Sequence, residues 1–227
     1  MAEIIERIVG DRALQLGNEE FVRPLGFGNN WAKIRIISRI LLNGSTTVAG
    51  AALKFGVCSG STDTFSSNNC VGWFGSNFPN AGSLPYSGTD YNTGGGFLFG
   101  YDYVKKIGAV TTVTSGGSKN YHAIAAPISG GYSLNVIDIA RSTLDATAYT
   151  VTTWNTKSPL VIPTSYAMYQ LAEDESLASG VSSNYLTGSL GPFTHTGLPA
   201  VMDTLSILWS KSTPTLEIAE LLVLRFN

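Results

Sequence analysis

The chain has 227 residues, of which 44% are hydrophobic and 13% are charged, about half of the usual charged share of roughly 25%. Such a chain can bury about 70% of the surface that its unfolded form exposes, and it is too apolar for a disordered protein. The formal net charge of −2 argues against a nucleic-acid partner, because phosphate binding needs clustered Lys and Arg.

The N-terminal residues carry apolar side chains at near-helical spacing: Ile4, Ile5, Ile8 and Val9. This spacing predicts a short helix or an arm over residues 1–20. Charged residues stand where a signal peptide would have its apolar core, so we expect no signal peptide. Because no run approaches the roughly 18 apolar residues of a membrane span, we also expect no membrane partner.

From Trp31 onward the hydrophobic period is two residues, which is typical of strands. The first such segment alternates Ile34, Ile36, Ile40 and Leu42 with Lys33, Arg35 and Arg39. Further strands are predicted at residues 53–57, 97–103, 134–139, 149–154, 166–171, 203–209 and 216–226, and around Val110 and Ile124. No helical stretch separates them, so the pattern predicts an all-β fold. We expect residues 21–227 to form a single domain, an antiparallel two-sheet sandwich or jelly roll.

Two long segments interrupt this pattern, at residues 59–96 and 173–202. The first is rich in Ser, Asn and Gly and contains several aromatic residues. Long loops in compact domains are usually functional, and aromatic faces beside short polar donors suit sugars and proteins alike. The candidate contacts for a glycan or a protein are Trp73, Phe74, Phe78, Tyr86 and Tyr91. The alternative is that these aromatics plug the ends of the sandwich.

The segment Gly56–Gly60 has the form of a nucleophile elbow with Cys58 in the place of serine. Such an elbow needs a helix after the nucleophile, and residues 61–67 do not predict one. We therefore assign no catalytic residue. No zinc ligands flank Cys58 or Cys70, and we expect two buried or half-buried free thiols, although their pairing is left open.

The remaining chemical groups form no motif, and we expect no metal and no cofactor. His122 falls in an apolar strand and His195 in a loop, and neither has metal-ligand spacing. Asp138 and Glu217 fall on predicted strands, where glycoside hydrolysis would require them to share one cleft. The acidic run at residues 173–175 is interpreted as a solvated loop.

The C-terminal stretches Asp203–Trp209 and Leu216–Val223 resemble the closing strands of concanavalin A-like (laminin G-like) jelly rolls. The rest of the chain has a polar composition rich in Gly, Ser, Thr and Asn, and in this composition it resembles components of bacteriophage or phage-like particles. Members of the lectin-like group often bind glycans, and the resemblance therefore implies a jelly roll with a glycan as one partner. No residue of this chain matches a binding site of that group.

Three functions follow as hypotheses, since a fold does not fix a function. The first is a non-enzymatic structural protein of a phage-like particle, such as a capsid, tail or fibre component. It would be assembled in the host cytoplasm, form homo-oligomers and contact other virion proteins. The second is a carbohydrate- or receptor-binding module, and the third a polysaccharide-cleaving enzyme on the same jelly roll.

Overall fold

The computed structural model describes residues 3–8, 14–28, 30–43, 52–60, 70–76, 97–99, 122–124, 133–155, 190–209 and 215–227. These residues form thirteen β-strands and no helix. The strands are β1 (Glu3–Ile8), β2 (Leu14–Leu16), β3 (Glu19–Pro24), β4 (Lys33–Asn43), β5 (Ala52–Cys58), β6 (Cys70–Ser76), β7 (Phe97–Phe99), β8 (His122–Ile124), β9 (Ser133–Arg141), β10 (Tyr149–Asn155), β11 (Leu190–His195), β12 (Thr204–Trp209) and β13 (Thr215–Phe226).

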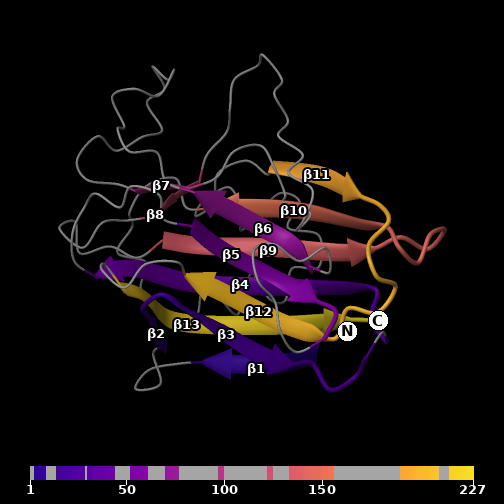
Figure 1. Ribbon diagram of the computed structural model, residues 1–227, viewed down its shortest axis with the longest axis horizontal. Coiled ribbons are helices and arrows are strands. Elements are labelled where there is room, and N and C mark those ends of the chain that lie inside the picture. The colour runs from indigo at the N-terminus through magenta and orange to yellow at the C-terminus, as the bar shows by residue number, and fades with distance from the viewer. Residues whose placement is uncertain are drawn as a thin grey trace, which may run out of the picture.

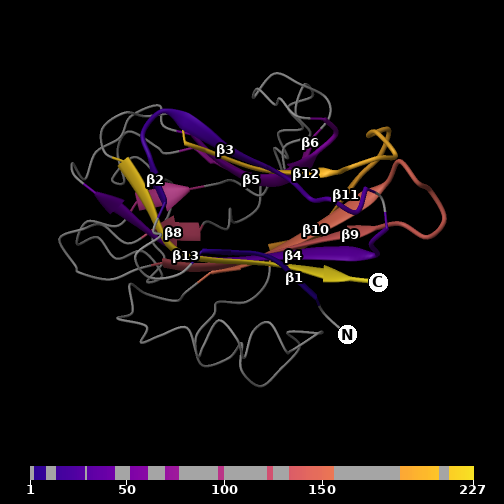
Figure 2. The same ribbon diagram turned by 90° about the horizontal axis from the view of Figure 1, so that it is seen from below.

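The described strands form two main sheets, and all of their pairings are antiparallel. Sheet A has the order β1-β13-β4-β9-β10-β11, with β2 also paired to β13. Sheet B has the order β3-β12-β5-β6, and β7 pairs with β8 in a small third sheet. Sheets A and B lie face to face as two layers (Figures 1 and 2). The predicted all-β sandwich is confirmed.

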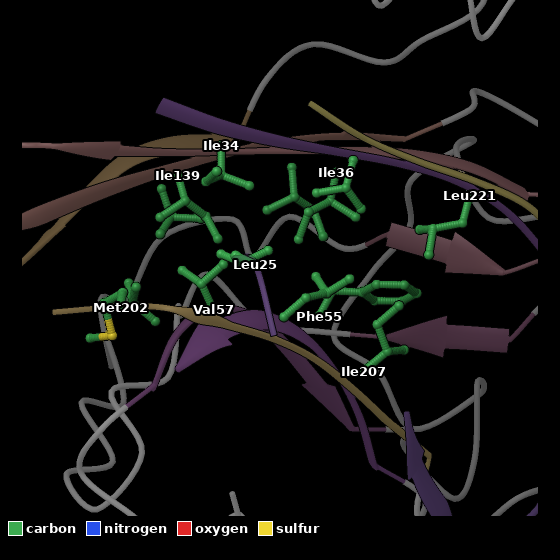
Figure 3. Packing of buried hydrophobic residues seen from close by; sticks show 14 of the residues in the cluster. Leu25, Ile34, Ile36, Phe55, Val57, Ile139, Met202, Ile207 and Leu221 are labelled. Carbon is green, nitrogen blue, oxygen red and sulfur yellow. The ribbon is translucent and has the colours of Figure 1, made fainter. Parts of the chain in front are cut away.

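Alternation along β4 explains how the sheets meet. Ile34, Ile36 and Ile40 of β4 belong to the core cluster between the sheets. Phe55 and Ile207 of sheet B belong to the same cluster, and Figure 3 shows side chains from both layers pointing toward one another. Because successive residues of a strand point to opposite faces, the basic residues of β4 lie on the outer face of sheet A, as predicted.

The outer face of sheet A is also buried within this single chain. Its apolar residues Ile37, Val136, Leu222 and Leu224 are all at most 2% exposed, yet they lie outside the core cluster between the sheets. The central part of sheet A, around β4 and β13, is therefore buried on both faces. The low overall charge of the sequence agrees with this arrangement, since little of this face needs a polar covering.

Of the two alternatives predicted for the N-terminus, a short helix or an arm, the helix is wrong. Glu3–Ile8 is strand β1 and pairs with β13, with a register shift between Ile4 and Glu6. Such a shift marks a β-bulge, in which an extra residue breaks the two-residue period. The apolar residues Ile4, Ile5 and Ile8 therefore do not follow a two-residue period. The short strand β2 also pairs with β13.

Both segments that were predicted as loops contain a strand. The first, at residues 59–96, contains β6, and the second, at residues 173–202, contains β11. Gly72 and Gly75 interrupt the apolar alternation of β6, and Pro192 does so in β11. Proline is tolerated in β11 because this strand lies at the edge of sheet A.

Several predictions fall outside the described residues or remain untested. The strands expected around Val110 and over residues 166–171, and the acidic run at 173–175, lie outside them. The single domain at residues 21–227 stays a prediction. In the parts of the chain that the structure describes, no helix is long and apolar enough to span a membrane.

Candidate functional site

Strand β6 carries two of the five predicted contact residues. Trp73 lies opposite the core residue Phe55, and Phe74 lies opposite Lys54. The strand forms one edge of sheet B. It begins at Cys70, opposite Cys58, and ends at Ser76, opposite Ala52. The other three candidates, Phe78, Tyr86 and Tyr91, lie outside the described residues, and the five-residue contact set stays a prediction.

Cys58 is disulfide-bonded and fully buried. The chain has only one other cysteine, Cys70, which is the direct cross-strand partner of Cys58. The predicted free thiols are therefore wrong. Opposed residues of antiparallel strands have Cα atoms about 4.5–5.5 Å apart, which lies within the range that a disulfide spans. The sequence pattern predicts a loop at residue 70, so it does not indicate that Cys58 and Cys70 lie side by side.

The disulfide also rules out the cysteine elbow as a nucleophile, because catalysis needs a free thiolate. Strand β5 does end at Cys58, as the elbow hypothesis required. The chain then turns through Ser59 and Gly60, whose φ of +85° favours glycine. This turn is held by Asp203, since the Gly60 N–H donates to Asp203 Oδ1 at 3.0 Å.

Asp203 joins three segments at one end of the sandwich. Its N–H donates to Cys58 O at 2.9 Å, and its carbonyl oxygen accepts a hydrogen bond from Leu25 N at 2.7 Å. Its carboxylate accepts a hydrogen bond from Thr204 Oγ1 at 3.1 Å, in addition to the bond from Gly60. No local sequence pattern predicts this role of Asp203, because the segments that it joins are distant in the chain.

We call this end of the molecule, residues 25–32, 59–60, 142–148 and 196–203, the hairpin end; it lies on the right in Figures 1 and 2. The Trp31 side chain is buried at the hairpin end, and its Nε1–H donates a hydrogen bond to Met202 O at 3.2 Å. The ring centroids of Trp31 and Tyr149 are 6.0 Å apart. The Tyr149 hydroxyl lies 2.9 Å from Pro199 O, and the Arg141 guanidinium lies 5.5 Å from the Trp31 ring.

A tight turn projects from the hairpin end between β9 and β10. Ser142 Oγ accepts hydrogen bonds from Leu144 N at 3.1 Å and from Asp145 N at 3.2 Å. Asp145 Oδ1 accepts two from Thr147, through N at 2.8 Å and Oγ1 at 2.7 Å. These bonds hold the pKa of Asp145 below its ordinary value. The turn presents Leu144 with 97% of its surface exposed.

Asp138 and Glu217 lie on strands, as predicted, but they do not form a catalytic pair. Asp138 is opposite Arg35 on β4, whereas Glu217 is opposite Leu41. Six residues of strand (41 − 35) separate these two levels, which is about 20 Å at 3.3 Å per residue. Glycosidase carboxylates lie only about 5–9.5 Å apart. This separation overturns the pair on which the enzyme hypothesis depended.

The Asp138 carboxylate instead neutralises a buried cation on the outer face of sheet A. Arg35 is fully buried and donates to it from Nε at 2.7 Å and from Nη2 at 2.8 Å. Lys33 Nζ lies 3.5 Å from the same carboxylate and 4.1 Å from the Phe226 ring centroid. A two-pronged pair of this kind is strong and geometrically specific. Its role is structural.

The histidines belong to different sheets. His122 is the first residue of β8, which confirms that it lies in a strand, and it is opposite Phe99. His195 ends β11 opposite Tyr149, so its predicted loop position is wrong. Among the described residues, no group of three or more His, Cys, Asp and Glu could hold a metal ion.

The described fold defines an antiparallel two-sheet β-sandwich. No family model matches the chain, and no curated protein matches it. Solved structures are similar over almost its whole length. A legume lectin-like domain from Entamoeba histolytica shares 8% identity at a TM-score of 0.44, covering 100% of this chain and 90% of that one.

Two further structures are similar to a comparable degree. The VIP36 exoplasmic/lumenal domain in its Ca2+/Man-bound form has 12% identity and a TM-score of 0.42, covering 100% of this chain and 82% of that one. The Emp46p carbohydrate recognition domain in its potassium-bound form has 10% identity and a TM-score of 0.40, covering 98% and 87%. These likenesses concern the overall strand arrangement, and no residue role is transferred from them.

Proposed function

We propose that this chain is a non-catalytic carbohydrate-binding β-sandwich module. The observation that carries the proposal is the position of β6 at one edge of sheet B, as far as the structure describes this sheet, with Phe74 opposite Lys54. Residues 77–96, which follow it in the sequence, combine aromatics with Asn, Ser and Gly. Aromatic faces stack on the apolar faces of sugars, and short polar side chains bind their hydroxyls.

The chemistry of the described residues favours binding over catalysis. Asp138 is held by a buried guanidinium, and Glu217 is about 20 Å from it along the strand direction. Cys58 is part of a disulfide. Asp138 and Cys58 are therefore engaged in structural bonds, and Asp138 and Glu217 are too far apart to act as a pair. The proposed contact residues remain Trp73, Phe74, Phe78, Tyr86 and Tyr91.

A glycan array probed with the full chain tests this proposal. We expect retained binding to a restricted set of glycans, and a loss of about two- to tenfold in affinity for Tyr91→Ala, since one stacking contact is worth about 0.5–1.5 kcal/mol. Trp73→Ala is a second variant, interpreted only if its circular dichroism and melting temperature match the wild type, because Trp73 pairs with a core residue.

Leu144→Ala provides the matched control. Leu144 is almost fully exposed and lies at the hairpin end, away from which β6 runs. This variant should bind like the wild type. The proposal fails if no glycan is retained, or if Tyr91→Ala and a folded Trp73→Ala both bind as tightly as the control.

A structural role in a phage-like particle is the second candidate, with the virion as its location. The observation that favours it is apolar exposure at the hairpin end, where Leu144 is 97% and Val201 45% exposed. An apolar side chain on an ordered turn suits a contact between subunits. Light scattering after size exclusion should then show oligomers that Leu144→Ser weakens. A strictly monomeric species at high concentration would count against self-assembly.

A further inference from the structure

The Cys58–Cys70 disulfide joins the ends of two strands at the hairpin end of sheet B. Cys58 is the last residue of β5 and Cys70 is the first residue of β6. Cys58 is fully buried, and its carbonyl oxygen accepts the hydrogen bond from Asp203. The bond therefore fastens β6 to a firmly held position in the fold.

The rest of the β5–β6 pairing mixes apolar pairs, such as Val57 opposite Val71, with pairs that include glycine. Gly56 lies opposite Gly72, so this cross-strand pair has no side-chain contact, and such contacts stabilise neighbouring strands. Strand β6 also contains Gly75 and has no charged residue. Glycine in a strand interior weakens it. In the described part of the chain, β6 pairs with β5 alone.

We propose that the disulfide is a redox-sensitive fastening that holds β6 on sheet B. Under oxidising conditions β6 is docked on β5. Under reducing conditions β6 detaches, while the core strands stay folded. The consequence for ligand binding rests on the proposed function, but the detachment of β6 does not.

The chemistry of this switch is thiol–disulfide exchange. Forming the bond removes two protons and two electrons from the two thiols, and a disulfide oxidant of the glutathione type accepts them and becomes two thiols. A dithiol reductant reverses the reaction. Because Cys58 is buried, a reductant reaches it only when the strand end opens. Disulfides persist in oxidising surroundings, so the docked form is the one expected outside a reducing cytoplasm.

Hydrogen–deuterium exchange of the purified full chain, with and without dithiothreitol, tests the proposal. Reaction with a thiol reagent confirms that two thiols are free after reduction. We expect amides of residues 70–76 to exchange at least about tenfold faster in the reduced chain, because local opening needs less free energy than global unfolding. Amides of β4 and β13 should keep their protection.

The double variant C58A/C70A is the matched control. In the absence of reductant it should exchange like the reduced wild type, and dithiothreitol should not change it. Unchanged protection of residues 70–76 on reduction would overturn the proposal. So would an equal loss of protection in β4 and β13, because the disulfide would then stabilise the whole fold rather than one strand.

The same samples on the glycan array separate this inference from the proposed function. Glycan binding that is equal in both redox states, with β6 protected in both, rejects the switch and leaves the module intact. Detachment of β6 in a chain that retains no glycan in either state rejects the module and leaves the switch intact.

Discussion

Arg35 is a fully buried guanidinium on the outer face of sheet A, and it forms a two-pronged ion pair with Asp138. A buried charge without a partner is far more costly than a buried pair, which itself contributes little. We therefore expect Asp138→Ala to lower the free energy of unfolding by about 3 kcal/mol. The replacement R35M/D138L should cost less, because it removes both charges.

Guanidinium chloride denaturation of the wild type, Asp138→Ala and R35M/D138L measures these differences in unfolding free energy, provided that the m-values are equal. A double variant that is less stable than Asp138→Ala would show that the ion pair contributes net stability. In that case the destabilisation of the single variant could not be assigned to an uncompensated Arg35.

Tyr149 gives the protein a predictable response to alkaline pH. Burial raises the pKa of its hydroxyl above the ordinary value of 10.0, and the positive charge of Arg141 opposes this effect. The folded state holds the proton more tightly than the unfolded chain. The contribution of Tyr149 to stability is thus fully present below about pH 10 and is lost as the pH rises through the folded pKa.

The variant Tyr149→Phe isolates this contribution. It loses the hydroxyl that lies 2.9 Å from Pro199 O, so it should be less stable than the wild type at pH 8. The difference between the two proteins should shrink as the pH rises above about 10. Denaturation curves at several pH values measure it, and parallel pH profiles would contradict the assignment.

At the scale of single elements, Gly72 of β6 has no room for a side chain. A Cβ atom at this position would overlap the backbone oxygen of Phe55, and a backbone atom cannot move aside cheaply. Gly72→Ala should therefore separate β5 from β6 and cost about 1–3 kcal/mol. Faster amide exchange in these two strands would locate the effect.

Gly26→Ala is the control for this change. Gly26 has a φ of +76° but nothing within 4 Å of a Cβ atom, so its substitution should cost about 1 kcal/mol of backbone strain and leave β6 protected. Equal exchange of β6 in both variants would show that crowding at Gly72 has no local effect.

The same elements show where sequence patterns predict strands and where they do not. The alternation of apolar and basic residues in β4, which only Ile37 and Ser38 interrupt between Lys33 and Ile40, predicts both its strand and its outward basic residues, because each position keeps its face along the whole strand. The bulge of β1 shifts that phase after Ile4, and the glycines of β6 interrupt it. Pairing between distant segments, as in the Cys58–Cys70 bond and the contacts of Asp203, leaves no local pattern.

At the scale of the whole molecule, the unusual feature is that the central strands of sheet A, around β4 and β13, are buried on both faces within one chain. A sandwich whose second face met water would carry polar residues there. Here Leu222 and Leu224 alternate with Leu221 and Val223 on β13, and all four are buried. Successive residues of this part of β13 point to opposite faces, but both faces carry apolar residues here. The sequence therefore shows no alternation of apolar and polar residues in this segment.

Leu221 and Leu222 provide a matched test of this arrangement, because they are adjacent and point to opposite faces. Leu221 belongs to the core between the sheets, whereas Leu222 does not, and both are at most 2% exposed. Replacement of either by alanine removes the same atoms from a buried site. Each variant should therefore lose about 2–5 kcal/mol of stability in urea denaturation. A loss below about 0.5 kcal/mol for Leu222→Ala alone, which is typical of surface positions, would mean that the outer face of sheet A is open to solvent and available to a partner.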